Sequence, residues 1–365
     1  MASTLAFLRQ YLRPRPGIVV AEPAVCRRGD ELLPATVYRP AGAHGARPGW
    51  VVLHGLTYHG REHPSLVKFA AAVAASGAVV VVPDIPEWTR LRVAPHVTGP
   101  SIHAGVAALR ERRDVAADRI GVIGFSFGAT QALVAAADPA LAAELRGVAA
   151  WGGYADVGRL FHFGITGEYD WQGATYHEDP DPYGRWIMGG NYLTAIPGYE
   201  GFGDTARALH RLAIAAGQAG IYAADAHFDP LKLELRATLS PAEQDVYDLF
   251  APLTTETHKD MARATRLAQD LAAAAVRTDP MLDPSPYLPR VAARTFVAHG
   301  RDDRLVPFTE AFRVSAALPP RVLRKAVITS LFSHSGGTRR ELSRFGVVRE
   351  GVRFVALLHG ILDLV

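Results

Sequence analysis

Short apolar runs alternate with helix-forming segments through the first 156 residues of this chain, and the alternation returns near its end. The run Ala78–Val82 holds no polar residue, which is typical of a strand buried on both faces of a sheet. Strands that alternate with helices predict a mostly parallel sheet covered by helices on both faces, an α/β fold. The expected strands are Ile18–Cys26, Glu31–Tyr38, Trp50–Leu53, Ala78–Val82, Arg119–Gly124, Gly147–Trp151, Ala292–Ala298 and Val322–Thr329, and the expected helices are Ser65–Ala75, Ile102–Arg112, Ala129–Leu145, Phe308–Ala317 and Phe345–Leu364.

The alternation stops between residues 156 and 290. Such a stretch is too long for a plain connection in a compact domain, so we expect it to form an insertion with structure of its own. Its first part is rich in glycine and aromatic residues, and the rest has helical spacing, as in Met261–Val276. The sequence therefore predicts a core made of residues 1–155 and 291–365, with a mainly helical cap or lid at 156–290.

Composition narrows the class of protein. Lys and Arg number 39 against 36 Asp and Glu, and the basic residues are scattered, so nucleic acid is not an expected partner. The single cysteine, Cys26, allows no intrachain disulfide. No run approaches the roughly 18 apolar residues of a membrane-spanning helix, and the N-terminal segment lacks the apolar stretch of a signal peptide. We expect a cytoplasmic protein without stable membrane insertion, and homo-oligomerisation is left open.

The sharpest local signal is the segment Gly124–Gly128 (GFSFG), which fits the pattern G-x-S-x-G. It follows an expected strand and precedes an expected helix, which is the setting of a nucleophile held on a strained turn. Glycines suit the flanking positions, because side chains there would collide with neighbouring backbone. The free N–H groups at the start of the helix can bind an oxyanion. We therefore predict that Ser126 is a catalytic nucleophile and that the backbone N–H of Phe127 is an oxyanion donor.

A second oxyanion donor is expected from the loop after the strand Trp50–Leu53, which reads His54-Gly55-Leu56. Acyl transfer needs two N–H donors aimed at the developing negative charge, and we assign the second to the backbone of Leu56. We expect His54 to orient this loop. Tyr58, two residues further on, is a candidate substrate contact.

Two polar segments follow the last expected strands. One is His299–Pro307 (HGRDDRLVP), which contains the adjacent acids Asp302 and Asp303. An acid here can hold a catalytic imidazole in the right tautomer and stabilise its charged form. The other contains His334, in a loop of Gly and Ser residues. A histidine in that loop can act as the general base for a serine.

Other candidate residues carry weaker signals. Two clusters of metal-binding residue types lack the ligand spacing of a metal site, so we expect no metal. These clusters are His54, His59 and His63, and His177, Glu178, Asp179 and Asp181. In the expected cap, Trp171 and Trp186 are candidate substrate contacts, and packing inside the cap is the alternative reading of its aromatic residues.

On these motifs the chain resembles the α/β-hydrolases, in their branch of esterases, lipases and dienelactone-hydrolase-like proteins, over residues 18–156 and 291–365. The order Ser126, Asp303, His334 matches the Ser…Asp…His order of that fold. In the family the acid commonly lies in G-x-x-D-x-x-V/I-P, a pattern that this chain matches, so the resemblance gives the role to Asp303 rather than Asp302. The family also places a lid where this chain has its insertion.

The resemblance implies a serine esterase that cleaves a small-molecule carboxylic ester through an acyl-enzyme, with a Ser126–His334–Asp303 triad and no cofactor. A serine at position 126 departs from dienelactone hydrolases, which have cysteine there. It also argues against the chemistry of haloalkane dehalogenases and epoxide hydrolases, whose relatives use aspartate. The alternatives are another acyl-transfer enzyme on the same triad, such as a peptidase, thioesterase, acyltransferase or perhydrolase, and a non-catalytic ligand-binding protein.

Overall fold

The computed structural model describes residues 1–42, 44–256, 260–330 and 344–365. Its main sheet has eight strands in the order β1-β2-β4-β3-β5-β6-β9-β10. The first hairpin strand β1 and its neighbour β2 are antiparallel to each other, β2 is antiparallel to β4, and the remaining neighbours are parallel. The strands are β1 Val19–Arg28, β2 Glu31–Pro40, β3 Arg47–Leu53, β4 Val79–Pro83, β5 Val115–Phe125, β6 Gly147–Trp151, β9 Arg294–Gly300 and β10 Leu323–Thr329. The mostly parallel α/β sheet predicted from the sequence is confirmed.

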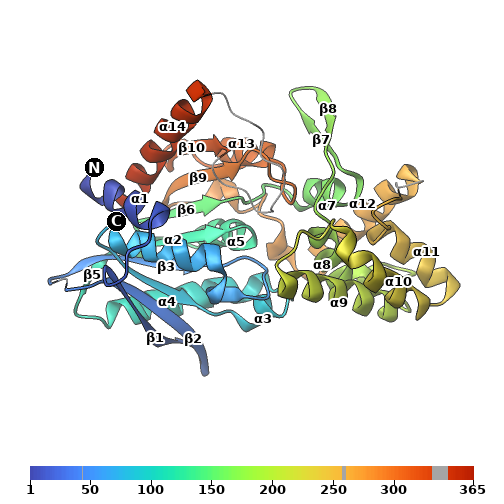
Figure 1. Cartoon of the computed structure of the whole chain (residues 1–365), viewed down its shortest axis with the longest axis horizontal. Coiled ribbons are helices and arrows are strands. Elements are labelled where there is room, and N and C mark those ends of the chain that lie inside the picture. Colours follow the sequence, from blue (N-terminus) through green and yellow to red (C-terminus); the bar gives the residue numbers. More distant parts are fainter. Residues whose placement is uncertain (43, 257–259, 331–343) are drawn as a thin grey trace.

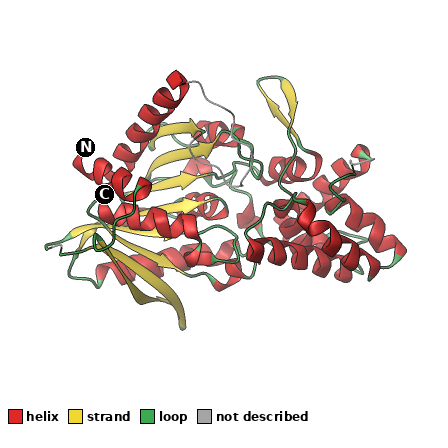
Figure 2. Cartoon of the chain, viewed as in Figure 1, coloured by secondary structure: helices red, strands yellow, loops and turns green. Residues whose placement is uncertain are grey.

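Helices cover both faces of this sheet (Figures 1 and 2). Along β4, Val79 and Val81 pack into one apolar core, and Val80 and Val82 pack into the other. Successive side chains of a strand point to opposite faces, so a strand covered on both sides needs a continuous apolar run. The first core also takes side chains from α4, α5 and α13, and the second takes them from α1, α2 and α14. The bounds are α1 Ala2–Leu12, α2 Pro64–Ala75, α3 Pro86–Thr89, α4 Thr98–Arg110, α5 Phe127–Ala135, α6 Pro139–Glu144, α13 Thr309–Ala317 and α14 Arg344–Leu362.

One helix that was expected from the sequence is divided into two helices in the structure. The sequence predicts a single helix over residues 129–145, whereas the structure ends α5 at Ala135 and begins α6 at Pro139. The carboxylate of Asp138 accepts a hydrogen bond from the N–H of Ala140, so it caps the second helix. Proline disfavours a helical conformation at the residue before it and suits the first turn of a helix, which explains the break.

The insertion, residues 156–290, lies at the carboxyl ends of the parallel strands, where Figure 1 shows its helices beside the arrowheads of the sheet. It also contains a two-stranded antiparallel hairpin that was not predicted from the sequence. Its elements are α7 Val157–Thr166, β7 Glu168–Trp171, β8 Ala174–His177, α8 Pro182–Tyr192, α9 Gly203–Ala219, α10 Asp229–Ala237, α11 Pro241–Phe250 and α12 Met261–Thr278. Within the described ranges, no helix is both long and apolar enough to span a bilayer.

Candidate active site

Ser126 occupies the turn between β5 and α5. Its backbone has φ 55° and ψ −124°, a left-handed conformation that is uncommon outside glycine. The N–H of Ser126 donates to the carbonyl of Trp151 at 2.8 Å, which ties the turn to the end of the neighbouring strand β6. Backbone strain of this kind persists where the surroundings hold it, and it is concentrated at functional sites.

The glycines on either side of Ser126 are required by close backbone approaches. A Cβ on Gly124 would collide with the carbonyl of Gly128 one helical turn away, and a Cβ on Gly128 would collide with the carbonyl of His54. A Cβ on Gly55 would lie only 3.1 Å from the Cβ of Ser126. The loop after β3 therefore packs directly against the serine turn.

His54 holds this loop by two hydrogen bonds. Its Nδ1 donates to the carbonyl of Gly55 at 2.7 Å, and its Nε2 accepts from the N–H of Ile85 at 3.1 Å. This pairing selects the neutral tautomer with its proton on Nδ1. Burial lowers the pKa of His54, which also favours the neutral imidazole. The carbonyl of Gly55 and the N–H of Leu56 belong to one planar trans peptide, so they point in opposite directions. With the carbonyl turned toward His54, the N–H of Leu56 points away from the imidazole.

Among the described residues, neither of the two expected oxyanion donors is used by the fold. Phe127 is the first residue of α5, so its N–H has no acceptor within the helix. In the part of the chain that the structure describes, the N–H of Leu56 makes no hydrogen bond either. The carbonyl of Leu56 accepts from the hydroxyl of Tyr183 at 3.3 Å, which links the loop to α8 of the insertion.

Asp303 lies three residues after β9 and is buried, with 1% of its surface exposed. Its Oδ1 accepts from the N–H groups of Leu305 and Val306 at 2.9 and 3.0 Å, and its Oδ2 lies 3.3 Å from Nε2 of His299. The adjacent Asp302 is partly exposed. His334 lies outside the described residues. The described strand before it, β10, pairs in parallel with β9, so these two strands end at the same edge of the sheet as Ser126.

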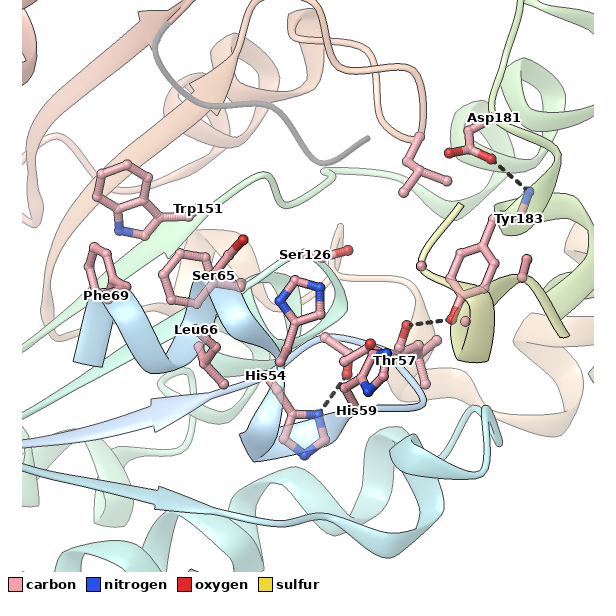
Figure 3. Close-up of a pocket in the computed structure, with 18 of the residues that line it drawn as sticks. His54, Thr57, His59, Ser65, Leu66, Phe69, Ser126, Trp151, Asp181 and Tyr183 are labelled. Atoms are coloured by element: carbon pink, nitrogen blue, oxygen red, sulfur yellow. Dashed lines mark hydrogen bonds between the residues drawn. The ribbon is translucent and has the colours of Figure 1, made fainter. Parts of the chain in front are cut away.

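Ser126 opens into a cavity of about 310 Å³ that lies between the core and the insertion. Figure 3 shows Ser126 with Phe69 and Trp151 on one side and with Asp181 and Tyr183 on the other. We call the first side the aromatic end. It is lined by Phe7 and Tyr11 of α1, Phe69 of α2, Phe125 of β5, Trp151 of β6 and Phe354 of α14. We call the second side the insertion end, and it is lined by Asp181, Tyr183, Tyr222 and small residues near the end of α9.

The structure puts the three expected substrate contacts elsewhere. Trp186 is fully buried inside the insertion and donates to the carbonyl of Phe250 at 2.9 Å. Trp171, on the β7–β8 hairpin, stacks on Phe312 with ring centroids 5.1 Å apart. Tyr58 is 41% exposed and is not among the residues that line the cavity. The aromatic residues at one end of the cavity come instead from the core, because α1, α2 and α14 converge on the sheet edge there, and Tyr183 and Tyr222 border the other end.

Asp181 and Tyr222 are cavity residues that were not predicted from the sequence as substrate contacts, whereas Tyr183 is one of the cap aromatic residues for which a pocket position was an open alternative. The pair Asp181-Pro182 is a common helix start, and Asp181 does cap α8. The sequence signal at Asp181 therefore predicts a helix cap and gives no sign that the residue also lines the cavity. In the described ranges, no group of three or more His, Cys, Asp or Glu side chains has the arrangement of a metal site.

No family model and no curated protein matches the sequence. Among solved structures, 2,6-dihydroxy-pseudo-oxynicotine hydrolase is 19% identical with a TM-score of 0.48, over 97% of this chain and 72% of that one. A Klebsiella pneumoniae protein described as a dienelactone hydrolase is 13% identical with a TM-score of 0.44, over 93% of this chain and 98% of that one.

The acylaminoacyl peptidase of Pyrococcus horikoshii is 13% identical with a TM-score of 0.48, over 96% of this chain. This chain covers 43% of that protein. At these identities and TM-scores the likenesses carry no activity and no substrate over to this chain. The strand order of the sheet and the strained serine turn between β5 and α5 give this chain the α/β-hydrolase fold.

Proposed function

We propose that this protein is a serine hydrolase that cleaves small-molecule carboxylic esters through an acyl-enzyme on Ser126. The observation that carries the proposal is the strained turn of Ser126, which opens into a cavity next to two backbone N–H groups that make no hydrogen bond within the described part of the chain. A helix start and a neighbouring strand end that both present N–H donors form an oxyanion site. A cavity of this size suits a small molecule.

In the proposed mechanism, His334 takes the hydroxyl proton of Ser126 as the serine oxygen attacks the acyl carbon. The N–H groups of Leu56 and Phe127 bind the oxyanion of the tetrahedral intermediate. His334 then protonates the leaving alcohol and next activates the water that releases the acid. Asp303 orients His334 and stabilises its charged form.

The first test is hydrolysis of p-nitrophenyl butyrate by the wild type, by Ser126→Ala and by the matched control Ser285→Ala. Ser285 is exposed and its hydroxyl bonds to Asp283, away from the cavity. We expect Ser126→Ala to lower kcat by at least ~10³-fold and Ser285→Ala to leave it unchanged. A fluorophosphonate should label the wild type and the control but not Ser126→Ala.

A panel of peptide anilides and thioesters, run beside the ester, separates esterase from peptidase and thioesterase activity. Ester hydrolysis that survives in folded Ser126→Ala would refute the proposal. Labelling of Ser126 with turnover only of the anilide or the thioester would move the activity to that class.

A further inference from the structure

The cavity around Ser126 has an unusual distribution of charge. Among the described residues that line it, Asp181 is the only carboxylate, and none is Lys or Arg. Its histidines include His54, which is held neutral, and His63, whose pKa burial lowers. A substrate carrying a carboxylate or phosphate would therefore find no cationic side chain in the described wall, whereas a positively charged substrate would find Asp181.

Asp181 is buried, and among the described residues it forms no ion pair. Only 5% of its surface is exposed, and its Oδ1 accepts from the N–H of Tyr183 at 3.0 Å. No cationic side chain of the described chain lies within the 4.0 Å of an ion pair with it. Figure 3 shows its second oxygen directed into the cavity. A buried carboxylate without such a partner is costly to keep, so this oxygen is suited to meet a ligand.

The surroundings of Asp181 support this view. Burial raises the pKa of its carboxyl to about 6, and the nearby negative charge of Asp303 acts in the same direction. Arg185 and Arg304 lower it, but without cancelling the burial. Of these two, Arg185 donates to the carbonyl of Phe250 and Arg304 donates to the hydroxyl of Tyr222. A cation bound in the cavity would favour the ionised carboxyl.

Two tyrosines border the same end of the cavity. Tyr183 lies on α8, two residues after Asp181, and its hydroxyl is engaged by the carbonyl of Leu56. Tyr222 lies after α9, and its hydroxyl accepts from Arg304 at 3.2 Å. With both hydroxyl groups held by protein atoms, the rings are the parts left for a ligand. Aromatic rings beside a carboxylate are the surroundings that substituted ammonium groups prefer.

We propose that the substrate carries a positively charged amine, which Asp181 binds between Tyr183 and Tyr222 at the insertion end of the cavity. The apolar part of the substrate then lies at the aromatic end, and the scissile bond lies between the two, over Ser126. Asp181 is the specificity-determining residue, because it distinguishes a cation from a neutral group of the same shape. This inference rests on the proposed hydrolase function and adds its substrate class.

The test uses pairs of p-nitrophenyl esters and thioesters that differ only by a trimethylammonium group in place of a tert-butyl group. In the first pair the group ends the acyl chain, and in the second it ends the leaving group, as in butyrylthiocholine. At about pH 8, where the carboxyl is ionised, we expect the wild type to prefer the cation in at least one pair by roughly tenfold or more in kcat/KM. Asp181→Asn should lower that preference by the same factor. Asparagine keeps an oxygen that can cap α8.

The matched control is Asp179→Asn, which removes an exposed carboxylate two residues away and should retain the preference. A second readout needs no turnover: calorimetry should show that trimethyl(phenylpropyl)ammonium binds the wild type at least about tenfold more tightly than it binds Asp181→Asn. Equal preference and equal affinity in the two proteins would overturn the inference. If the neutral esters are still hydrolysed through Ser126 in that case, the proposed hydrolase function stands without it.

Discussion

His54 offers a direct test of how the oxyanion loop is positioned, because its two ring nitrogens do different work. Nδ1 holds the carbonyl of Gly55 at 2.7 Å, and Nε2 accepts the N–H of Ile85 at 3.1 Å. Glutamine places its amide where Nε2 lies, so His54→Gln keeps the bond to Ile85 and loses the one to Gly55. Asparagine places its amide where Nδ1 lies, so His54→Asn keeps the bond to Gly55 and loses the other. Both remove the edge-on contact with Trp88, whose ring centroid is 5.5 Å away.

We expect His54→Gln to lower mainly kcat and His54→Asn to lower mainly the free energy of unfolding. Losing an oxyanion donor outright costs about 10²–10³-fold in kcat, so releasing the Gly55–Leu56 peptide in His54→Gln should cost roughly 10- to 100-fold. His54→Asn leaves the buried N–H of Ile85 without an acceptor, which costs about 1–3 kcal/mol of unfolding free energy. It should cost much less in kcat, since the peptide stays oriented.

The assay is kcat on p-nitrophenyl butyrate beside urea unfolding for both variants, with the wild type as reference. Both variants lose the ring, so the comparison between them cancels the effect of the lost packing. An equal fall in kcat in both, or a larger fall in His54→Asn, would refute the role of His54 in aiming the N–H of Leu56.

Three further predictions follow from the site. Asp303→Asn should lower kcat by about 10³–10⁴-fold while Asp302→Asn costs far less, and equal mild losses would place the acid elsewhere. Phe354→Ala should shift the preference among p-nitrophenyl esters toward longer acyl chains, because it enlarges the aromatic end of the cavity. Trp171 packs on Phe312 of the core, outside the cavity, so Trp171→Ala should leave the acyl-length profile unchanged. Because the pKa of Asp181 is raised to about 6, its carboxyl is largely protonated below that pH and ionised above it. The ratio of kcat/KM for a cationic ester to kcat/KM for its neutral counterpart should therefore rise between about pH 5 and pH 7.5. A ratio that stays constant with pH would contradict the role of Asp181.

The raised pKa of Asp181 also bears on stability. An aspartate whose folded pKa lies above its unfolded value stabilises the fold fully at low pH and loses that contribution as the pH rises through the folded pKa. Asp181→Asn should therefore be at least as stable as the wild type above about pH 7. An ionised carboxyl that lowers the stability of the fold is expected at a functional site, because activity there commonly requires some loss of stability.

Local sequence was enough to predict the architecture and the serine turn. Strands such as Val79–Pro83 are apolar throughout because both faces of the sheet are covered, and that demand is visible in the run of valines itself. The turn at Ser126 also carries a local signal, since its glycines lie two residues away on each side, although the backbone that packs against Gly128 is that of His54 in the loop after β3. The loop His54–Leu56 could be placed for the same reason, because it begins where a strand ends.

The walls of the cavity could not be predicted in this way. Phe7, Phe69 and Phe354 are far apart in the chain, and only the packing of α1, α2 and α14 over the sheet edge brings them together. By contrast, Trp186 has the same aromatic character and is buried within the insertion. Asp181 carries a local signal, but that signal is for a helix cap. Periodicity and turn chemistry depend on neighbours in sequence, so the sequence by itself determined the fold class and the nucleophile. The side chains that line the cavity are brought together by contacts between elements far apart in the chain, and only the tertiary structure decided which residues these are.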